Sequence, residues 1–257
     1  MWLKSSSVGR KLIMSITGAF LILFLTFHVL MNSVALLWPS AYNVICAFLG
    51  ANWYALVGTA VLAGGFVAHI LFAFWLTIQN RKARGNDRYA VTDKPKQVEW
   101  ASQNMLVLGI VVIAFLVVHM IQFWSKMQLV ELTGNIDPNL PPQAGTLFLQ
   151  KAFEQVWTLP VYLIGFVALW FHMTHGFWSM FQSAGWNNDT WLPRLKCIGN
   201  WWTTIVIGLF VLQAVVFTIQ ANDKAYEKCP ELQKQYQEFK MEHAASHVEC
   251  PMLDINK

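Results

Sequence analysis

Five long apolar stretches dominate the pattern of hydrophobic and polar positions along the chain. They cover approximately residues 12–37, 53–79, 101–126, 157–182 and 201–221. Each supplies roughly the 20 mostly apolar residues that one helical crossing of a bilayer requires. The stretches are continuous and lack strict apolar/polar alternation, which favours helices over the strands of a membrane barrel. The pattern predicts an all-α bundle of five transmembrane helices within residues 1–222, followed by a polar tail at 223–257.

The composition agrees with an integral membrane protein. Of the 257 residues, 56% are hydrophobic and only 12% are charged, which leaves too little polar surface to cover a water-soluble globule. Lys4, Arg10 and Lys11 precede the first apolar stretch, as in a secretory signal peptide. That stretch is far longer than the roughly 7–15 residues of a signal-peptide core, so we expect it to be retained as the first helix.

Basic residues mark one side of the predicted bundle. They gather in the N-terminal segment and in the second and fourth connections: Lys4, Arg10, Lys11, Arg81, Lys82, Arg84, Arg88, Lys94, Lys96, Arg194 and Lys196. The first connection has no charged residue, and the third has Lys151 against Glu131, Asp137 and Glu154. The positive-inside rule predicts a cytoplasmic N-terminus, so five crossings place the C-terminal tail on the outer side, which is the periplasm if the membrane is a bacterial inner membrane.

Cys229 and Cys250 lie near the two ends of the tail. On the periplasmic side they could form a disulfide, with free or differently paired thiols as an equal alternative. One uninterrupted helix between them would hold them about 30 Å apart, whereas a disulfide requires Cα atoms within about 7 Å, so a bridge requires the chain to reverse. Cys46 and Cys197 fall on opposite sides of the predicted membrane and should not pair.

Motifs for soluble chemistry are missing from the sequence. It contains no glycine-rich phosphate loop, no zinc-type cysteine spacing and no nucleophile elbow. The predicted topology accounts for the basic residues, so nucleic acid is not an expected partner. Any chemistry is therefore expected inside the membrane.

Five of the seven histidines fall inside the apolar stretches: His28, His69, His119, His172 and His175. Ionisable side chains are costly in a bilayer and usually face a partner or a cavity. A single such histidine is most often a hydrogen-bonded packing residue. Five histidines on four consecutive helices favour ligation instead.

The histidines also fall at two depths. At about 1.5 Å per residue, His28 lies about 16 residues and His119 about 18 residues into helices that run outward. His69 and His172 each lie about 16 residues into helices that run inward, so this pair is nearer the cytoplasm. The two levels differ by roughly 10–15 Å, and each level joins two non-consecutive helices.

Two opposed imidazoles across a helical bundle are the usual way to fill both axial positions of a haem, which favours electron transfer over oxygen binding. Zinc is a weaker hypothesis, because no carboxylate or thiolate lies near either level. A proton relay would not require two matched levels. Glycines within the helices either leave room for a macrocycle or let helices pack closely. They are Gly18, Gly58, Gly64, Gly65, Gly109, Gly165 and Gly176.

The five apolar stretches together resemble one known family, the di-haem cytochrome b subunits of succinate:quinone oxidoreductases, which comprise succinate dehydrogenases and quinol:fumarate reductases. The resemblance spans about residues 8–220 and excludes the tail. Its landmarks are KLIMSITGAFLILFLTFHVLMN, GGFVAHILFAFWLTIQNRKARGNDRYA, ASQNMLVLGIVVIAFLVVHMIQFW and VWTLPVYLIGFVALWFHMTHGFWSMFQSAGW. Each motif is weak alone, and their order and spacing make the match specific.

The resemblance implies a role for each matched residue. His69 and His172 would bind the proximal haem b, and His28 and His119 the distal one. The family ligand stands four residues before a helix-four glycine, which selects His172 over His175. Ser15 matches a family serine near a haem propionate.

The resemblance also implies partners and a substrate. The family anchors a flavoprotein subunit and an iron–sulfur subunit on the cytoplasmic side and passes electrons between them and a membrane quinone, expected here to be menaquinone. This chain carries no flavin or iron–sulfur motif, so it has no dicarboxylate active site of its own. Membrane lipid surrounds it, and pairing of two complexes is left open. Either direction, succinate oxidation or fumarate reduction, is compatible with the sequence.

Two positions depart from the family pattern. Some fumarate reductases of the family have a glutamate two residues before the helix-four ligand, and here that residue is Trp170. We therefore expect the associated proton route to be missing, which would make electron transfer across the membrane electrogenic. An acid implicated in quinol oxidation near the start of helix two has no match around Gly50, Ala51 and Asn52.

His175 has two interpretations. It lies three residues after His172, about 4.5 Å closer to the cytoplasm and about 60° around the helix axis. We expect it either to donate a hydrogen bond to a propionate or a bound water at the haem edge, or to bond a neighbouring helix.

Two further hypotheses compete with the di-haem anchor. A haem-free, histidine-bearing transporter or channel would also place polar residues in the membrane. It lacks a buried acidic partner, and five crossings do not divide into an inverted repeat. A purely structural anchor without cofactors is the third hypothesis, and the four matched histidines argue against it.

Overall fold

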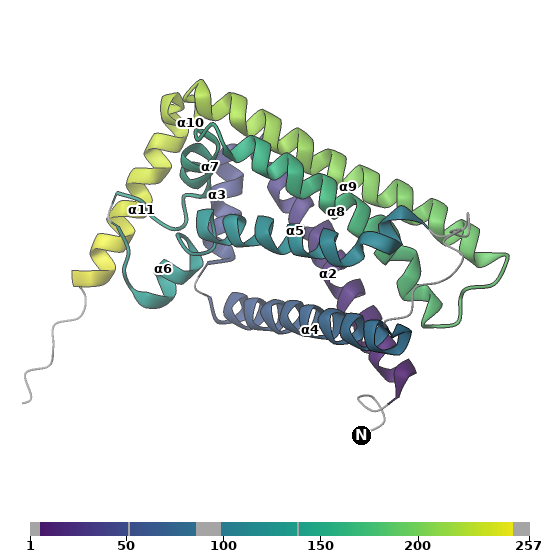
Figure 1. The fold of residues 1–257 in the computed structure, drawn as a ribbon. Coiled ribbons are helices and arrows are strands. Elements are labelled where there is room, and N and C mark those ends of the chain that lie inside the picture. The colour runs from purple at the N-terminus through teal and green to yellow at the C-terminus, as the bar shows by residue number, and fades with distance from the viewer. Residues whose placement is uncertain (1–5, 51, 86–98, 138, 249–257) are drawn as a thin grey trace, which may run out of the picture. The chain divides into compact units, whose positions relative to one another are not determined.

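The computed structural model describes residues 6–50, 52–85, 99–137 and 139–248. Every regular element among these residues is a helix, and Figure 1 shows them in chain order. The predicted all-α class is therefore confirmed for the described part of the chain.

Five of the helices are long and apolar enough to cross a membrane, as predicted. They are α2 (Ser7–Leu37), α4 (Trp53–Arg84), α5 (Trp100–Gln122), α8 (Thr158–Gln182) and α9 (Trp191–Asn222). The end of α9 at Asn222 coincides with the predicted start of the tail.

Local capping explains where two of these helices differ from the predicted ranges. The helix α2 begins earlier because the Ser6 hydroxyl accepts a hydrogen bond from the Gly9 N–H at 2.9 Å, which satisfies a free donor of the first turn. The helix α9 begins at Trp191 instead of residue 201 because Asn188 Oδ1 accepts bonds from the backbone N–H groups of Thr190 and Trp191 at 3.1 and 2.8 Å. Side-chain caps thus extend the helices beyond the apolar runs.

The described residues of the connections and of the tail form five shorter helices. They are α3 (Pro39–Phe48), α6 (Gln128–Thr133), α7 (Gly145–Phe153), α10 (Ala225–Lys228) and α11 (Pro230–Val248). The apolar pattern did not predict them. Pro39 occupies the first turn of α3, where its missing N–H costs nothing.

The chain divides into two compact units. Unit 1 comprises Met1–Val29, Val57–Leu116 and Val161–Val211, and unit 2 comprises Leu30–Leu56, Val117–Pro160 and Leu212–Lys257.

Aromatic side chains form much of the core of unit 1. The Phe166 ring stacks on Phe210 at 5.6 Å and meets Phe115 edge-on at 5.5 Å between ring centroids. Phe115 lies directly against Gly165, where a Cβ would overlap its ring. This glycine therefore serves close helix packing.

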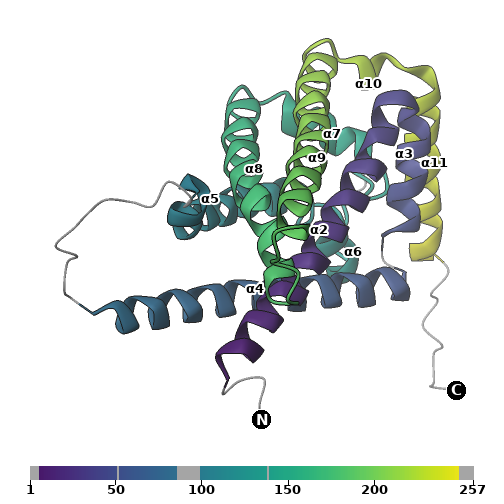
Figure 2. The same ribbon diagram turned by 90° about the vertical axis from the view of Figure 1, so that its right-hand side faces the viewer.

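The tail belongs to unit 2, where α11 packs against α3 (Figure 2). Asn43 of α3 is fully buried, and its amide donates to Gln235 Oε1 at 2.8 Å. Its Oδ1 accepts from the N–H and the hydroxyl of Thr146 at 2.9 and 2.8 Å, and Thr146 Oγ1 lies 2.7 Å from the Tyr236 hydroxyl. This buried polar network joins α3, α7 and α11.

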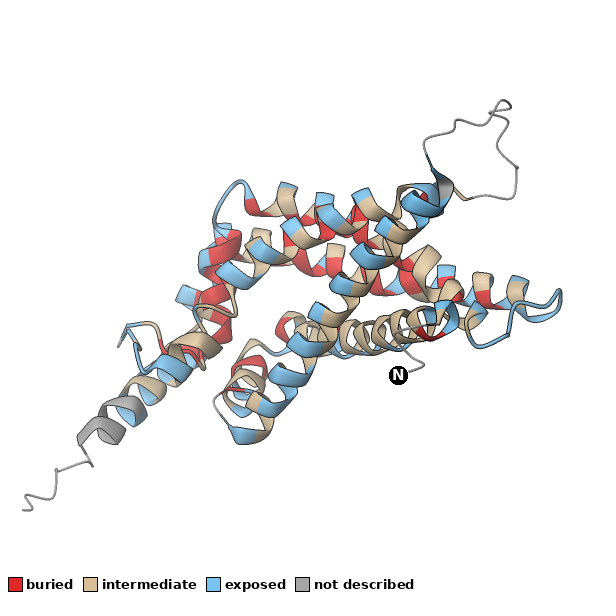
Figure 3. Cartoon of the chain, turned by 60° about the horizontal axis from the view of Figure 1, so that its bottom comes forward, coloured by how far each residue is buried: buried red, intermediate tan, exposed pale blue. Residues whose placement is uncertain are grey.

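The long helices keep many apolar side chains exposed, as contact with lipid requires. Leu23, Leu71 and Ile164 are 70%, 61% and 63% exposed. None of the described side chains of α4 is buried, whereas buried and exposed residues share α8 and α9 (Figure 3).

Candidate functional site

Unit 1 brings His69 of α4 and His172 of α8 together. Their ring centroids lie 6.3 Å apart and their planes are inclined by 66°. The spacing of residues along the helices predicts the same two histidines at the inner level. Their role as haem ligands stays a prediction.

The distance between the two rings suits two imidazoles on one metal ion. A bond from a metal to an imidazole nitrogen is about 2.0–2.1 Å long, and that nitrogen lies about 1.2 Å from the centre of its ring. Two imidazoles on opposite sides of one iron would therefore have ring centroids roughly 6 Å apart. Among the described residues no group of three or more His, Cys, Asp or Glu side chains could hold a metal ion. A haem needs only two protein ligands, because its porphyrin supplies the other four nitrogens.

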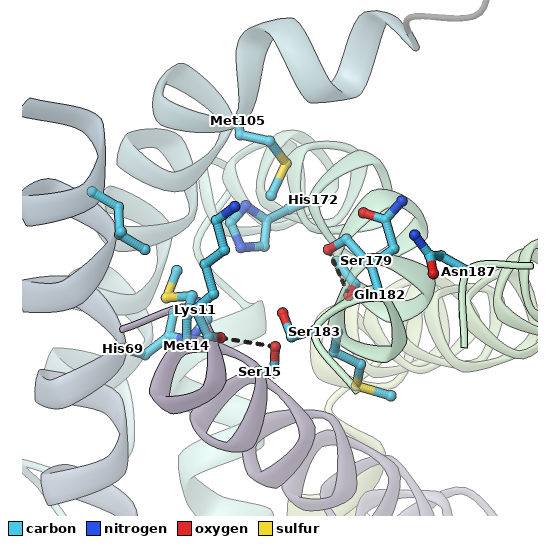
Figure 4. Close-up of a pocket in the computed structure, with 13 residues that line it drawn as sticks. Lys11, Met14, Ser15, His69, Met105, His172, Ser179, Gln182, Ser183 and Asn187 are labelled. Atoms are coloured by element: carbon cyan, nitrogen blue, oxygen red, sulfur yellow. Dashed lines mark hydrogen bonds between the residues drawn. The ribbon is translucent and has the colours of Figure 1, made fainter. Parts of the chain in front are cut away.

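A cavity of about 480 Å³ lies beside the pair and is lined by both imidazoles (Figure 4). This volume is within the range of about 300–1,000 Å³ typical of cofactor sites. Gly18 and Gly109 face the rings, since a Cβ at these positions would lie 3.6 Å from His69 Cε1 and 3.7 Å from His172 Cε1. Gly176 also lines the cavity and has open space beside it. These three glycines leave room beside the imidazoles, unlike Gly165.

Polar side chains gather on one side of the same cavity, where Figure 4 shows Ser179, Gln182, Ser183 and Asn187 together. Lys11 and Ser15 of α2 also line it. Such a mixture of apolar and polar walls suits a flat apolar ligand that carries acidic groups. The Ser15 hydroxyl donates to the Lys11 carbonyl at 3.0 Å, so it would have to rotate to donate to a propionate.

The two imidazoles differ in their hydrogen bonds. His69 Nδ1 lies 3.2 Å from the Thr17 hydroxyl. His172 Nδ1 is buried and has no hydrogen-bond partner within the described part of the chain. A buried polar atom without a partner is uncommon, and an absent water or ligand is one explanation for it. The donor set and the cavity fit a haem.

The two histidines predicted for the outer level belong to different compact units, His28 to unit 1 and His119 to unit 2. His28 stacks on Phe24 at 5.3 Å and lies 6.0 Å from Phe210 between ring centroids. His119 lies 5.2 Å from Phe123. The pairing of His28 with His119 stays a prediction.

His175 contacts a neighbouring segment. Its Nδ1 lies 3.3 Å from Oε2 of Glu99, the residue before α5, and its ring meets Trp178 edge-on at 4.8 Å. Both interpretations of His175, a bond to a propionate and a bond to a neighbouring helix, stay predictions. The Lys196 ammonium lies 2.7 Å from Glu99 Oε1. Partial burial raises the pKa of Glu99, but the hydrogen bonds from Lys196 and His175 outweigh it and lower this pKa overall.

Several residues of the site escaped the sequence analysis. Thr17 and Glu99 contact histidines from other helices, so no fixed spacing could indicate them. In unit 2, Glu131 lies against Gly50, where a Cβ would be 2.8 Å from Glu131 Oε2.

A second cavity of about 490 Å³ lies in unit 2. Its apolar wall includes Val118 and Ile121 of α5, which flank His119 in the sequence, together with Phe148 and Trp157. Lys126, Lys151, Gln122 and Gln155 supply hydrogen-bond donors, and Glu154 is the acidic lining residue. The cavity therefore suits an apolar ring with polar oxygens.

Cys229 carries a free thiol in the described part of the chain. Cys250 lies outside the described residues, so a Cys229–Cys250 disulfide stays a prediction.

Comparisons with protein-family models, with curated proteins and with solved structures find no match to this chain.

Proposed function

We propose that this chain is the di-haem cytochrome b membrane anchor of a succinate:quinone oxidoreductase. The observation that carries the proposal is the His69–His172 pair, whose ring centroids are 6.3 Å apart beside a cavity with one polar side. His69 and His172 hold the proximal haem b, and His28 and His119 hold the distal one.

The residues around the inner pair have separable tasks. When bound, the haem iron supplies a one-electron carrier that alternates between two oxidation states. His69 and His172 would hold the iron with two imidazole nitrogens, a ligand set that would suit electron transfer instead of oxygen binding. Lys11 offers a positive charge to the propionates, and Gly18 and Gly109 keep side chains away from the imidazoles.

Menaquinone is the proposed electron partner at the outer level. The cavity in unit 2 supports this assignment, because it is lined by residues that flank His119 and by donors such as Lys126 and Gln155. Donors of this kind can hydrogen-bond quinone oxygens, and the apolar wall can contact the ring. The Trp170 indole donates to Thr204 at 3.0 Å and offers no carboxyl group for a proton route beside His172.

The remaining assignments follow from topology. The N-terminus faces the cytoplasm, where the flavoprotein and iron–sulfur subunits bind, and the tail faces the periplasm of a bacterial inner membrane. The dicarboxylate reaction takes place in the flavoprotein. This chain contributes membrane anchoring and electron transfer to the respiratory chain and, when succinate is oxidised, to the tricarboxylic acid cycle.

A reduced-minus-oxidised spectrum with pyridine haemochrome quantitation tests the proposal. We expect a b-type spectrum and two haems per chain. A content of one haem per chain would rule out one of the two proposed haem sites. A protein without b-type absorption would overturn the proposal and favour a haem-free transporter that uses the same polar cavity.

A further inference from the structure

Thr17 of α2 is the hydrogen-bond partner of His69. Its Oγ1 lies 3.2 Å from His69 Nδ1, and it also lies 2.9 Å from the Ile13 carbonyl and 3.1 Å from the Met14 carbonyl. All these residues belong to unit 1. The hydroxyl therefore has three neighbours but only one hydrogen to donate.

The backbone carbonyls decide where that hydrogen goes, because a carbonyl oxygen can only accept. Threonines inside helices commonly donate to the carbonyl four residues earlier. Thr26, Thr77 and Thr218 do so in this chain, at 2.9, 2.8 and 2.7 Å. With the Thr17 hydrogen donated to Ile13 in the same way, only its lone pairs remain for His69. His69 Nδ1 must then be the donor.

We infer that Thr17 is a positioning residue that holds His69 in the tautomer with its proton on Nδ1, so that Nε2 presents a lone pair to the haem iron. A neutral imidazole has one N–H, so a proton on Nδ1 leaves Nε2 as the basic nitrogen. Ligating histidines generally donate their second nitrogen in this manner, which fixes the ring and raises its basicity. This inference rests on the proposed function.

The next residue in α2 supports the same arrangement. A Cβ at Gly18 would lie 3.6 Å from His69 Cε1 and 3.9 Å from His69 Nδ1, so this edge of the ring rests on the Thr17–Gly18 step. No described residue offers His172 Nδ1 a comparable bond. The inner site is therefore asymmetric, and α2 orients the His69 side.

The test compares Thr17→Val, which removes the hydroxyl at nearly constant shape, with Thr17→Ser, which keeps it. Thr26→Val is the matched control, because Thr26 makes the same bond to its own helix and has no hydrogen bond to a histidine among the described residues. Full-length protein is purified from membranes. The readouts are haem loss to apomyoglobin, the midpoint potential of each haem and the low-spin EPR signal.

We expect Thr17→Val to weaken retention of the proximal haem by about 10–100-fold, the usual effect of losing such a partner. Its midpoint potential should rise, because a less basic ligand stabilises the oxidised iron less. A tenfold change in the oxidised-to-reduced ratio would correspond to about 59 mV for one electron. Thr17→Ser and Thr26→Val should match the wild type.

Three outcomes separate the inference from the proposed function. Wild-type protein without b-type haem would overturn both. The Thr17 role alone would be overturned if Thr17→Val and Thr26→Val each kept two haems, with the same haem retention and the same midpoint potentials in both variants. It would also be overturned if Thr17→Ser behaved like Thr17→Val. Retention of the distal haem in the same sample shows that the variant is folded. If Thr17→Val loses both haems, Thr17→Ala is tested in its place under the same criteria. If Thr17→Ala also loses both haems, a role of Thr17 confined to the proximal haem is overturned.

Discussion

Lys196 and Glu99 form a close ion pair, with the Lys196 Nζ 2.7 Å from Glu99 Oε1. The same ammonium lies 4.3 Å from the centre of the buried Trp178 ring, an arrangement that favours the cation. His175 contacts the second carboxylate oxygen at 3.3 Å. Glu99 thereby connects the start of α5 to α8 and α9 within unit 1.

The Glu99 pair predicts a pH-dependent stability. The lowered pKa of Glu99 means that its ionised form stabilises the folded state above the usual value of 4.5, and that this contribution is lost as the pH falls through the lower folded pKa. Glu99→Gln should destabilise by at most about 1 kcal/mol at pH 7, since the carboxylate is partly exposed. The Tm difference from wild type should shrink toward zero well below pH 4.5. Glu154→Gln, at an exposed carboxylate, is the control; a constant difference would contradict the prediction.

Replacing single histidines should separate the two haem levels. Under the proposed function, His69→Ala or His172→Ala should remove the proximal haem and leave the distal one, because each would delete one of the two ligands proposed for it. His28→Ala or His119→Ala should do the opposite. Haem stoichiometry and redox titration measure this, and a crossed result would contradict the pairing.

His175→Ala is the matched control, three residues from His172. It should leave the content of both haems unchanged, because its described partners are Glu99 and Trp178. A shifted proximal potential would support a contact with a propionate. An unchanged potential would leave His175 as a residue that bonds the neighbouring segment.

Gly109 should tolerate only a small side chain. Its Cβ would lie 3.7 Å from His172 Cε1, an ordinary contact, so Gly109→Ala should keep the proximal haem. The larger Gly109→Phe should displace the imidazole and lose roughly half of the total haem, one of two groups. Gly208 has open space around it, and Gly208→Phe should retain both. Equal haem content in the two phenylalanine variants would refute the role of Gly109.

The buried amide of Asn43 should hold the tail helix. Asn43→Ala would leave the Thr146 N–H and the Gln235 amide oxygen without their partner. Each of these groups that stays buried would lower the free energy of unfolding by about 1–3 kcal/mol. Hydrogen exchange in α11 should accelerate. Asn222→Ala should not change it, since Asn222 is exposed and its amide donates to the Thr218 carbonyl of its own helix. Unchanged exchange in Asn43→Ala would show that the network does not secure the tail.

Two cysteines should differ in reactivity and report the topology. Burial raises the pKa of Cys46 to about 12, so its reactive thiolate is about one part in ten thousand at pH 8. Cys197 is exposed. A membrane-permeant maleimide should label Cys197 and spare Cys46, as mass spectrometry can measure. In intact cells a membrane-impermeant maleimide should leave Cys197 unlabelled, because the proposed orientation places this residue on the cytoplasmic side. Labelling of Cys197 by this reagent would contradict that orientation.

Much of the fold could be predicted from local sequence. The length and continuity of the apolar runs predicted five long helices, because a bilayer requires about 20 apolar residues per crossing. The ends were less predictable, since caps such as Ser6 and Asn188 act through a few polar atoms. Short helices such as α3 and α7 lack a long apolar run and escaped prediction.

The sequence by itself determined the number of long apolar helices, because rise per residue and membrane thickness are local constraints. The two histidine depths stay a prediction from the same constraints. Tertiary structure decided which side chains meet. The 6.3 Å approach of His69 to His172, the Thr17 bond and the Glu99 contact with His175 all depend on how separate helices rotate and pack. Spacing along one helix specifies a face, whereas a partner on another helix is selected only when the helices pack together.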